Sequence, residues 1–378
     1  MRLQIGGSPC THWSIAQTKN RETEPSGIGW DLFENYLIAL DKFKPDFFLY
    51  ENNKSMSSAI REEITKRFGF EPICINSALV SAQNRQRLYW CGKRNPDGTY
   101  SKVEIEQPED RGILLRDILE TGVAWREKGY TLKANYTNAG AVNGVDGGHF
   151  PAPMAAEPIR IGTIENAAKN ADFDSQPYRV YSPDGKSVTL CGQGGGVGAK
   201  TGLYAVPVIP DGNGQFVIKA AGGKEIPVYE VRGGRITIKG KTYPIKLADG
   251  FYIIRKLTVT ECKRLQTVPD TYAFPVSDTQ AYKMLGNGWT VDVVSYLMSH
   301  FVGITTESLD VLSMYDGMAC GHIALDKLGA HIQRYRATEI DKYAITTACQ
   351  NFPDIEQLGD AFQVREESFL LEDDFHGI

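Results

Sequence analysis

Three segments within the first ninety residues carry side chains that could perform chemistry. The first is GGSPC, which follows the apolar residues 3–5 and ends in Cys10. A cysteine at a strand end, beside free backbone N–H groups, can have its thiolate stabilised and act as a nucleophile. A lone cysteine is more often a small buried apolar residue. Cys10 is therefore a candidate nucleophile only in the company of other reactive groups.

The next two segments supply such groups. Glu51 and Asn52 close the apolar run DFFLYENN. A carboxyl group at a buried strand end can donate a proton to a bound molecule, although a polar residue at a strand terminus is also ordinary. Arg85 and Arg87 alternate in QNRQR, so on an extended segment they point the same way. Two guanidinium groups on one face suit a carbonyl oxygen, a carboxylate or a phosphate, but this motif alone favours surface arginines.

The C-terminal part contains a candidate nucleoside pocket. The strand-like run VLSM leads into the glycine turn YDGMACG, and the segments ATEID and LGD follow. A turn at a helix N-terminus offers N–H groups to an anionic ligand group, and an acidic residue after the next strand can accept from ribose hydroxyls. Residues 316–321, Glu339 and Asp360 describe such a pocket. The spacing is not GxGxxG, which argues against NAD, and isolated glycine turns are common on structural grounds alone.

The elements that must position these residues form an α/β pattern with an insertion. Residues 1–94 predict strands at 3–5, 46–51, 72–80 and 88–91 and helices at 30–43 and 58–68, typical of a parallel sheet with covering helices. After residue 251 the sequence predicts helices at 258–265, 289–301, 319–328 and 343–351 and strands at 309–314 and 335–340. Turn residues crowd the stretch between. We therefore expect a fold in two parts, residues 1–94 and 251–378, around an inserted β-rich domain at 95–250.

Together the motifs resemble those of the DNA cytosine-5 methyltransferases. GGSPC resembles the nucleophile motif, ENN the glutamate motif, QNRQR the arginine motif and YDGMACG the cofactor loop, while RKLTVTECKRLQTVPD and MLGNGWTVDVV resemble the last two blocks. GGSPC with a DG loop is closest to the de novo (type 3) branch and its bacterial and phage relatives. The resemblance implies a Rossmann-like S-adenosylmethionine-dependent methyltransferase sheet, with residues 95–250 as the target-recognition domain.

The order of the motifs departs from that family. There the cofactor strand comes first and the final helix block last, whereas this chain starts at the nucleophile strand and reaches GDAF only after the final block. The resemblance therefore implies a circular permutation. The new termini would lie in the surface connection between the third and fourth strands, where a break removes no core contact.

The resemblance also implies a role for each motif. Cys10 would add to C6 of a cytosine flipped out of the duplex, Glu51 would support N3, and Arg87 with Arg85 would hold O2 or the adjacent phosphate. Ser8, Pro9 and Asn52 would contact the substrate, and residues 11–29 would form a loop that closes over it. The cofactor would be S-adenosylmethionine, with S-adenosylhomocysteine as product and no metal. Its implied contacts are Asp316, Gly317, Met318, Ala319, Cys320, Glu339, Ile340, Asp360, Ala361, Phe362, Asn287, Gly288 and Trp289.

Charge and composition bear on partners. The net charge is −5, but residues 1–256 hold 33 Lys+Arg against 28 Asp+Glu, while residues 257–378 hold 8 against 18. The nucleophile, arginine and recognition segments are thus the mildly basic part, as a surface facing double-stranded DNA requires. No apolar run of membrane-spanning length and no secretory signal occur, so we expect no membrane partner and a cytoplasmic, bacterial or phage-encoded enzyme. A cognate restriction endonuclease is a further candidate partner; the oligomeric state and the recognition sequence stay open.

Three other functions fit less well. A tRNA cytosine-5 methyltransferase of the same fold would carry a Cys-Phe-Thr signature, which does not occur here. A catalytically silent DNA-binding relative would usually lack the cysteine or the glutamate, and both are present. A Rossmann oxidoreductase is disfavoured by the missing GxGxxG and would leave Cys10 and Glu51 without a role.

Overall fold

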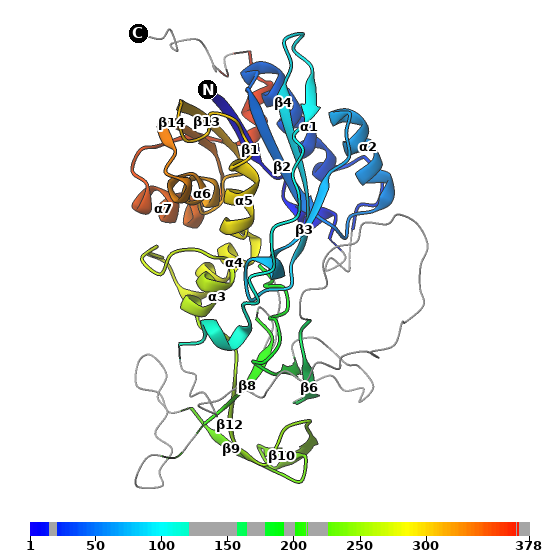
Figure 1. Ribbon diagram of the computed structural model, residues 1–378, viewed down its shortest axis with the longest axis vertical. Coiled ribbons are helices and arrows are strands. Elements are labelled where there is room, and N and C mark those ends of the chain that lie inside the picture. Colours follow the sequence, from blue (N-terminus) through cyan, green and yellow to red (C-terminus); the bar gives the residue numbers. More distant parts are fainter. Residues whose placement is uncertain are drawn as a thin grey trace.

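In the computed structural model the described residues form two β-sheets, which lie one beyond the other along the long axis of the molecule (Figure 1). It describes residues 1–14, 21–120, 157–164, 178–192, 201–208, 210, 226–367 and 369. The first sheet carries the nucleophile, glutamate, arginine and cofactor motifs. The second sheet is built from strands between residues 160 and 255, so its strand β12 (Gly250–Arg255) runs past residue 250, where the expected insertion ends.

The first sheet has eight strands in the order β15-β14-β13-β1-β2-β4-β3, with β5 paired to β4. The strands are β1 (Arg2–Gly6), β2 (Phe47–Asn53), β3 (Ile73–Asn76), β4 (Gln86–Arg94), β5 (Tyr100–Lys102), β13 (Ser308–Met314), β14 (His331–Thr338) and β15 (Ile355–Gly359). The five strands from β15 to β2 are parallel, but β4 runs antiparallel to both β2 and β3. The expectation of a purely parallel sheet is therefore wrong at this edge, because the short connection from β3 to β4 reverses the chain instead of crossing over through a helix.

Helices cover both faces of this sheet (Figure 1). On one side lie α1 (Ile28–Phe43) and α2 (Ser58–Phe68), and on the other lie α5 (Val291–Met298), α6 (Cys320–Leu328) and α7 (Lys342–Asn351). Neighbouring residues of one strand serve different cores: Leu49 packs in the same cluster as residues of α5 and α6, whereas Phe48 and Tyr50 pack with those of α1 and α2. This period-2 alternation explains why the whole of β2 is buried.

The first strand of the chain lies in the middle of the sheet. β1 pairs in parallel with β2 on one side and with β13 on the other. The Met1 ammonium group donates a hydrogen bond to the Ser308 carbonyl at 2.9 Å, at the start of β13. The C-terminal strands thus complete the sheet from the side opposite β2.

The second sheet has seven strands in the order β11-β10-β9-β12-β8-β7-β6. They are β6 (Arg160–Thr163), β7 (Arg179–Tyr181), β8 (Leu203–Pro207), β9 (Val228–Arg232), β10 (Arg235–Ile238), β11 (Lys241–Pro244) and β12 (Gly250–Arg255). Every pair is antiparallel except β7 with β8. Residues 121–156, 165–177, 193–200, 209 and 211–225 of the expected insertion lie outside the described residues.

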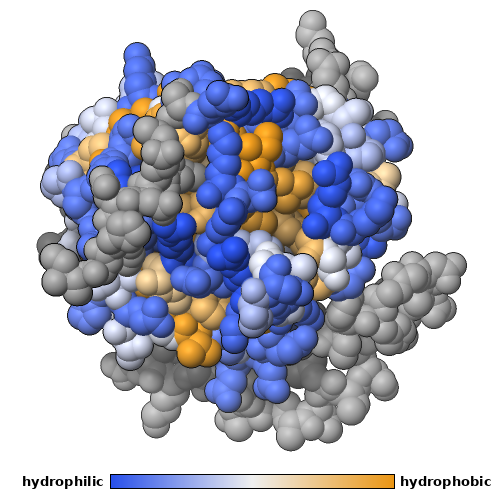
Figure 2. Space-filling model, turned by 90° about the horizontal axis from the view of Figure 1, so that it is seen from above, coloured by the Kyte–Doolittle hydropathy of each residue, from blue (hydrophilic) through white to orange (hydrophobic). Residues whose placement is uncertain are grey.

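Two helices join the sheets. α3 (Val259–Leu265) corresponds to the predicted helix at 258–265 and starts with a capping box, in which the Thr258 hydroxyl accepts from the Glu261 amide and the Glu261 carboxylate accepts from the Thr258 amide. α4 (Asp278–Asn287) was not among the predicted elements, although its apolar residues Ala281, Tyr282, Met284 and Leu285 are buried. Among the described residues, no helix is both long and apolar enough to cross a bilayer. The end of the molecule seen in Figure 2 is mostly hydrophilic around a central apolar patch.

Candidate active site

The nucleophile segment lies directly against the end of β2. Cys10 opens the short 3-10 turn η1 (Cys10–His12); its side chain is outside the described part. A Cβ at Gly7 would stand 2.6 Å from the Glu51 carbonyl oxygen and 3.0 Å from Glu51 Oε2, so only glycine allows this approach. The backbone of GGSPC and the Glu51 carboxyl group are therefore neighbours.

A buried hydrogen-bond cluster fixes that neighbourhood. The Ser8 and Tyr50 hydroxyls are 2.7 Å apart, and the Asn52 amide donates to the Ser8 carbonyl at 3.2 Å. Burial raises the pKa of Tyr50, so its hydroxyl stays neutral. Ser8 and Asn52 are buried while Pro9 is exposed. Of the three residues expected to contact the substrate, two face each other within the protein.

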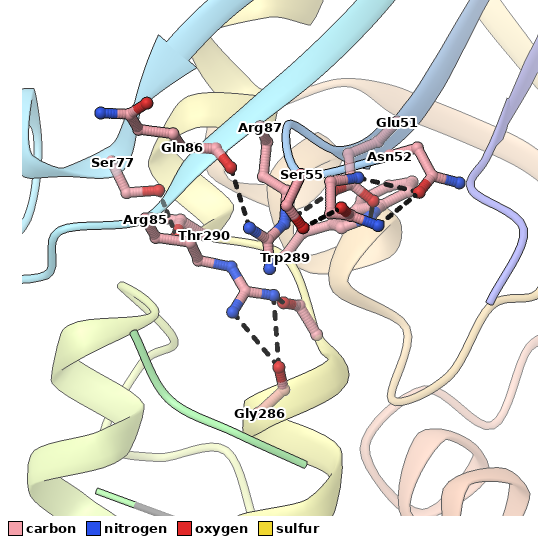
Figure 3. Close-up of polar contacts among 12 residues, drawn as sticks. Glu51, Asn52, Ser55, Ser77, Arg85, Gln86, Arg87, Gly286, Trp289 and Thr290 are labelled. Atoms are coloured by element: carbon pink, nitrogen blue, oxygen red, sulfur yellow. Dashed lines mark hydrogen bonds and ion pairs between the residues drawn. The ribbon is translucent and has the colours of Figure 1, made fainter. Parts of the chain in front are cut away.

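Glu51 stands at the centre of the site (Figure 3). Its Oε1 forms an ion pair with Arg87 Nε at 3.1 Å, and its Oε2 accepts from the Trp289 indole N–H at 3.0 Å. Both side chains of the ion pair are largely buried. Trp289 lies 238 positions away in the sequence, so the fold joins the glutamate motif, the arginine motif and the last helix block in one contact.

The two arginines of QNRQR have different partners (Figure 3). Arg87 reaches Glu51. Arg85 is only 3% exposed and donates to the carbonyl oxygens of Gly286 at 3.2 Å, Gly288 at 2.9 Å and Leu190 at 3.4 Å. Its guanidinium fork thus joins the sheet to the turn after α4.

Residues 189–192, beside the second sheet, also reach this turn, and sequence reasoning missed them. The Thr189 hydroxyl donates to the Asn84 carbonyl at 2.6 Å. A Cβ at Gly192 would stand 2.0 Å from Asn287 Oδ1, and one at Gly286 would stand 2.3 Å from the Gly192 nitrogen. The two glycines permit a backbone contact that no other residue would allow. The glycine-rich run 192–198 was the available signal.

The cofactor motifs gather at the ends of β13, β14 and β15. Asp316 Oδ1 accepts from the Ser313 hydroxyl at 2.6 Å and from the Tyr335 hydroxyl at 2.8 Å. Its Oδ2 is buried and has no hydrogen-bond partner among the described residues. Burial raises the pKa of Asp316 to about 6. A buried carboxylate oxygen without a donor is a place for a cationic group of a ligand.

The backbone of the YDGMA loop is unusual. Tyr315, Gly317 and Ala319 have φ values of 61°, 60° and 59°, in the left-handed region that only glycine adopts without cost. Glu339 holds the loop, because its carboxylate accepts from the Gly317 amide at 2.8 Å and from the Ile340 and Asp341 amides. Strain of this kind concentrates at ligand sites.

The other residues expected to contact the cofactor differ in their exposure to solvent. Ile340 is 73% exposed, which is unusual for an isoleucine, and Asn287 is also exposed. Asp360 caps the 3-10 turn η5 (Ala361–Arg365) through the Phe362 amide at 3.0 Å. Buried residues of the set are Met318, Ala319, Cys320 and Ala361. Burial raises the pKa of Cys320 to about 12, which makes it an unreactive thiol. No cluster of three or more potential metal ligands occurs among the described residues.

A sheet with helices on both faces and polar groups collected at the strand ends is a Rossmann-like α/β fold. A profile described as C-5 cytosine-specific DNA methylase matches residues 3–302. The chain belongs to that family, whose members are DNA cytosine-5 methyltransferases and use S-adenosylmethionine as methyl donor.

Three relatives similar to this chain are type II or orphan methyltransferases. The chain is 30% identical over 305 residues to the type II methyltransferase M.HhaI of Haemophilus parahaemolyticus, covering 78% of this chain and 74% of the relative. It is 25% identical over 302 residues to the type II methyltransferase M.FnuDI of Fusobacterium nucleatum (76% and 73% covered) and 26% identical over 322 residues to the orphan methyltransferase M.SPBetaI of Bacillus phage SPbeta (71% and 68%). The crystal structure of the S. pombe Dnmt2 methyltransferase superposes with a TM-score of 0.38 at 15% identity over 79% of this chain and 76% of that one.

Proposed function

We propose that Cys10, Glu51 and Arg87 are the catalytic residues with which this enzyme methylates C5 of a cytosine flipped out of double-stranded DNA. The observation that carries the proposal is the convergence on Glu51 of Arg87 and Trp289, beside the backbone of the Cys10 segment. A carboxyl group and a guanidinium held 3.1 Å apart offer, side by side, the groups that N3 and O2 of cytosine require.

The reaction then follows from the chemistry of the base. The Cys10 thiolate forms a bond to C6, and the electrons of the C5–C6 double bond make C5 nucleophilic. Glu51 hydrogen-bonds N3, where negative charge develops, and Arg87 hydrogen-bonds O2. S-adenosylmethionine, when bound, would supply the methyl group that C5 takes up, and would leave as S-adenosylhomocysteine. Loss of the C5 proton to a base and expulsion of the Cys10 thiolate restore the ring.

Arg85 has a different proposed role. Its donors are engaged by backbone carbonyl oxygens on the turn of Trp289, so it acts as a positioning residue that holds Trp289 against Glu51. Ser8 and Asn52, which bond to each other, likewise hold the GGSPC backbone in place. Pro9, exposed beside them, is the member of that set that stays a proposed substrate contact.

The residues at the ends of β13 to β15 suit S-adenosylmethionine. The unpaired Asp316 Oδ2 would take its ammonium group, Glu339 its ribose hydroxyls, and Ile340 with Phe362 the adenine. We place the methionine carboxylate near Asn287, Gly288 and Trp289. Met318, Ala319, Cys320 and Ala361 would shape the site from beneath, because they are buried.

We also infer that the chain is a circular permutation of the family order. β1 lies between β2 and β13, and the family profile ends at residue 302, before the three strands that carry the cofactor motifs. The DG loop keeps the de novo branch as our proposed placement. Residues 95–250 would then form the target-recognition domain, with Leu190 and Gly192 approaching the site from it.

The proposed partner is double-stranded DNA. The excess of basic over acidic residues in residues 1–256 supports this partner, because DNA is negatively charged. Type II and orphan enzymes both occur among the relatives, so a cognate endonuclease stays an expectation, as does a cytoplasmic location.

A covalent trap tests the catalytic roles. Duplex DNA containing 5-fluorocytosine, incubated with S-adenosylmethionine, should form a stable adduct with the enzyme, because fluorine at C5 cannot leave as a proton does. Cys10→Ala should form none, and bisulfite sequencing should show protected cytosines only with the unaltered enzyme. An adduct with Cys10→Ala would show that another residue is the nucleophile.

A further inference from the structure

The segment that follows the nucleophile is tied back on itself at Glu22. The Glu22 amide donates to the His12 carbonyl at 2.9 Å. The Glu22 carboxylate accepts from the Trp13 indole N–H at 3.2 Å and from the Gly29 amide at 3.1 Å, and lies 3.5 Å from His12 Nδ1. One carboxylate therefore connects η1 with the first turn of α1. We call these four residues, His12, Trp13, Glu22 and Gly29, the Glu22 clamp.

Two glycines leave the space that this carboxylate occupies. Gly27 caps α1 with a φ of 84°, and a Cβ there would lie 2.7 Å from Glu22 Oε1. A Cβ at Gly29 would lie 2.5 Å from Glu22 Oε2 and 2.6 Å from Trp13 Nε1. The N-cap of α1 has no side-chain hydrogen bond of its own, so Glu22 supplies the negatively charged acceptor that a helix N-terminus favours. The sequence GIGW thus accommodates a carboxylate from elsewhere in the chain.

The Glu22 clamp is anchored on both sides. Trp13 is fully buried, in the same apolar cluster as Trp30 and Phe33 of α1. Arg21 donates to the Trp13 carbonyl at 3.1 Å and to the Ser55 carbonyl at 2.6 Å. Ser55 follows β2, the strand that carries Glu51. The turn that begins with Cys10 is therefore connected to the glutamate strand by a second route, independent of the Ser8–Asn52 contact.

We propose that Glu22 is a positioning residue for methyl transfer: through Trp13 and Gly29 it holds η1, and with it the Cys10 backbone, in register with the end of β2. The proposal rests on the proposed function, since it assigns a support to the nucleophile. Glu22 touches neither substrate nor cofactor. Its loss should therefore slow bond formation at C6 without weakening cofactor binding.

Three variants break the clamp in different ways. Glu22→Gln removes the charge, Trp13→Phe removes the indole donor and keeps an aromatic ring, and Gly29→Ala displaces the carboxylate through its Cβ. Glu24→Gln is the matched control, because Glu24 is an exposed acid two positions away. The rate of adduct formation on 5-fluorocytosine duplex DNA at saturating S-adenosylmethionine is measured for each, together with dissociation constants for S-adenosylmethionine and DNA and the melting temperature.

Glu22→Gln should slow adduct formation by about 10- to 100-fold, the range expected for lost hydrogen bonds to a charged group, with both dissociation constants within about twofold of the unaltered enzyme. Trp13→Phe and Gly29→Ala should act in the same direction, and Glu24→Gln should match the unaltered enzyme. Full adduct rates in the folded clamp variants, or an equal loss of cofactor affinity, would overturn the proposal. If the unaltered enzyme formed no adduct, the proposed function would be refuted as well. If the unaltered enzyme formed the adduct normally and the clamp variants were unaffected, only the proposed role of Glu22 would be refuted.

Discussion

The two ends of the site are built differently. At the catalytic end, charged groups already have partners within the protein: Glu51 has Arg87 and Trp289, and Arg85 has three backbone carbonyl oxygens. At the cofactor end, Asp316 keeps a buried oxygen without a donor among the described residues, and Ile340 leaves most of its side chain exposed.

This difference separates two kinds of requirement. Groups that act on a developing charge must be held before the substrate arrives, since their reorganisation during reaction would cost rate. Groups that bind a cofactor can remain unsatisfied in the protein, because the ligand supplies the missing contacts and its binding free energy offsets their cost. Substitutions at the catalytic end should therefore change rate or fold, and those at the cofactor end should change affinity and pH dependence.

Glu51→Gln should have the largest effect. Glutamine keeps the size of the side chain but carries no charge to pair with Arg87 and cannot transfer a proton to N3, so single-turnover methyl transfer should fall by about 10²- to 10⁴-fold. The dissociation constant for S-adenosylmethionine should hardly change. Glu62→Gln, at an exposed position of α2, is the control. A rate close to that of the unaltered enzyme would mean that the catalytic end does not act through this carboxyl group.

Substitutions of the two arginines should affect different properties, the stability of the fold for Arg85 and the rate of methyl transfer for Arg87. Arg85→Lys keeps the charge but cannot span the Gly286 and Gly288 carbonyls with one ammonium group, so the free energy of unfolding should fall by about 2–4 kcal/mol. Arg87→Lys can still pair with Glu51, so its stability should change by less than about 1 kcal/mol while the rate falls by about tenfold. Urea unfolding and single-turnover kinetics measure both. Equal losses of stability would contradict the assignment.

The sequence predicted most elements of the first sheet, because their hydrophobic periods are strong. The helix at 30–43 corresponds to α1, and the strand at 46–51 corresponds to β2. The strand at 88–91 lies within β4 (Gln86–Arg94), but its antiparallel direction was not predictable, since an apolar run has no direction until its connection is known. α4 was not predicted because its ten residues are fewer than the window over which a helical period becomes visible, although Tyr282, Met284 and Leu285 lie in the main core.

The candidate site shows a similar limit. Motif spacing indicated which residue types matter, but not which of them meet. That Trp289 donates to Glu51, or that Arg85 turns to backbone carbonyls, depends on segments about 200 or more positions apart. The Glu22 clamp escaped for the same reason: a carboxylate in a polar segment has no sequence pattern, and only the two glycines that make room for it were visible.

The smallest expected effect lies at the cofactor end and depends on pH. Because burial raises the pKa of Asp316 to about 6, above its value in the unfolded chain, the folded protein binds the extra proton between these values. The stabilisation from Asp316 is thus fully present below the unfolded pKa and is lost as the pH rises through 6. Asp316→Asn cannot titrate. From pH 4.5 to 7.5 the ligand-free unaltered protein should therefore lose about 1–3 kcal/mol of unfolding free energy relative to this variant, as measured by urea unfolding at each pH.

Saturating S-adenosylmethionine should reduce that loss, since an ammonium group beside the unpaired Oδ2 favours the charged carboxylate. A difference between the two proteins that stays constant with pH would show that Asp316 is already satisfied, and the contrast between the two ends would fail at its cofactor side.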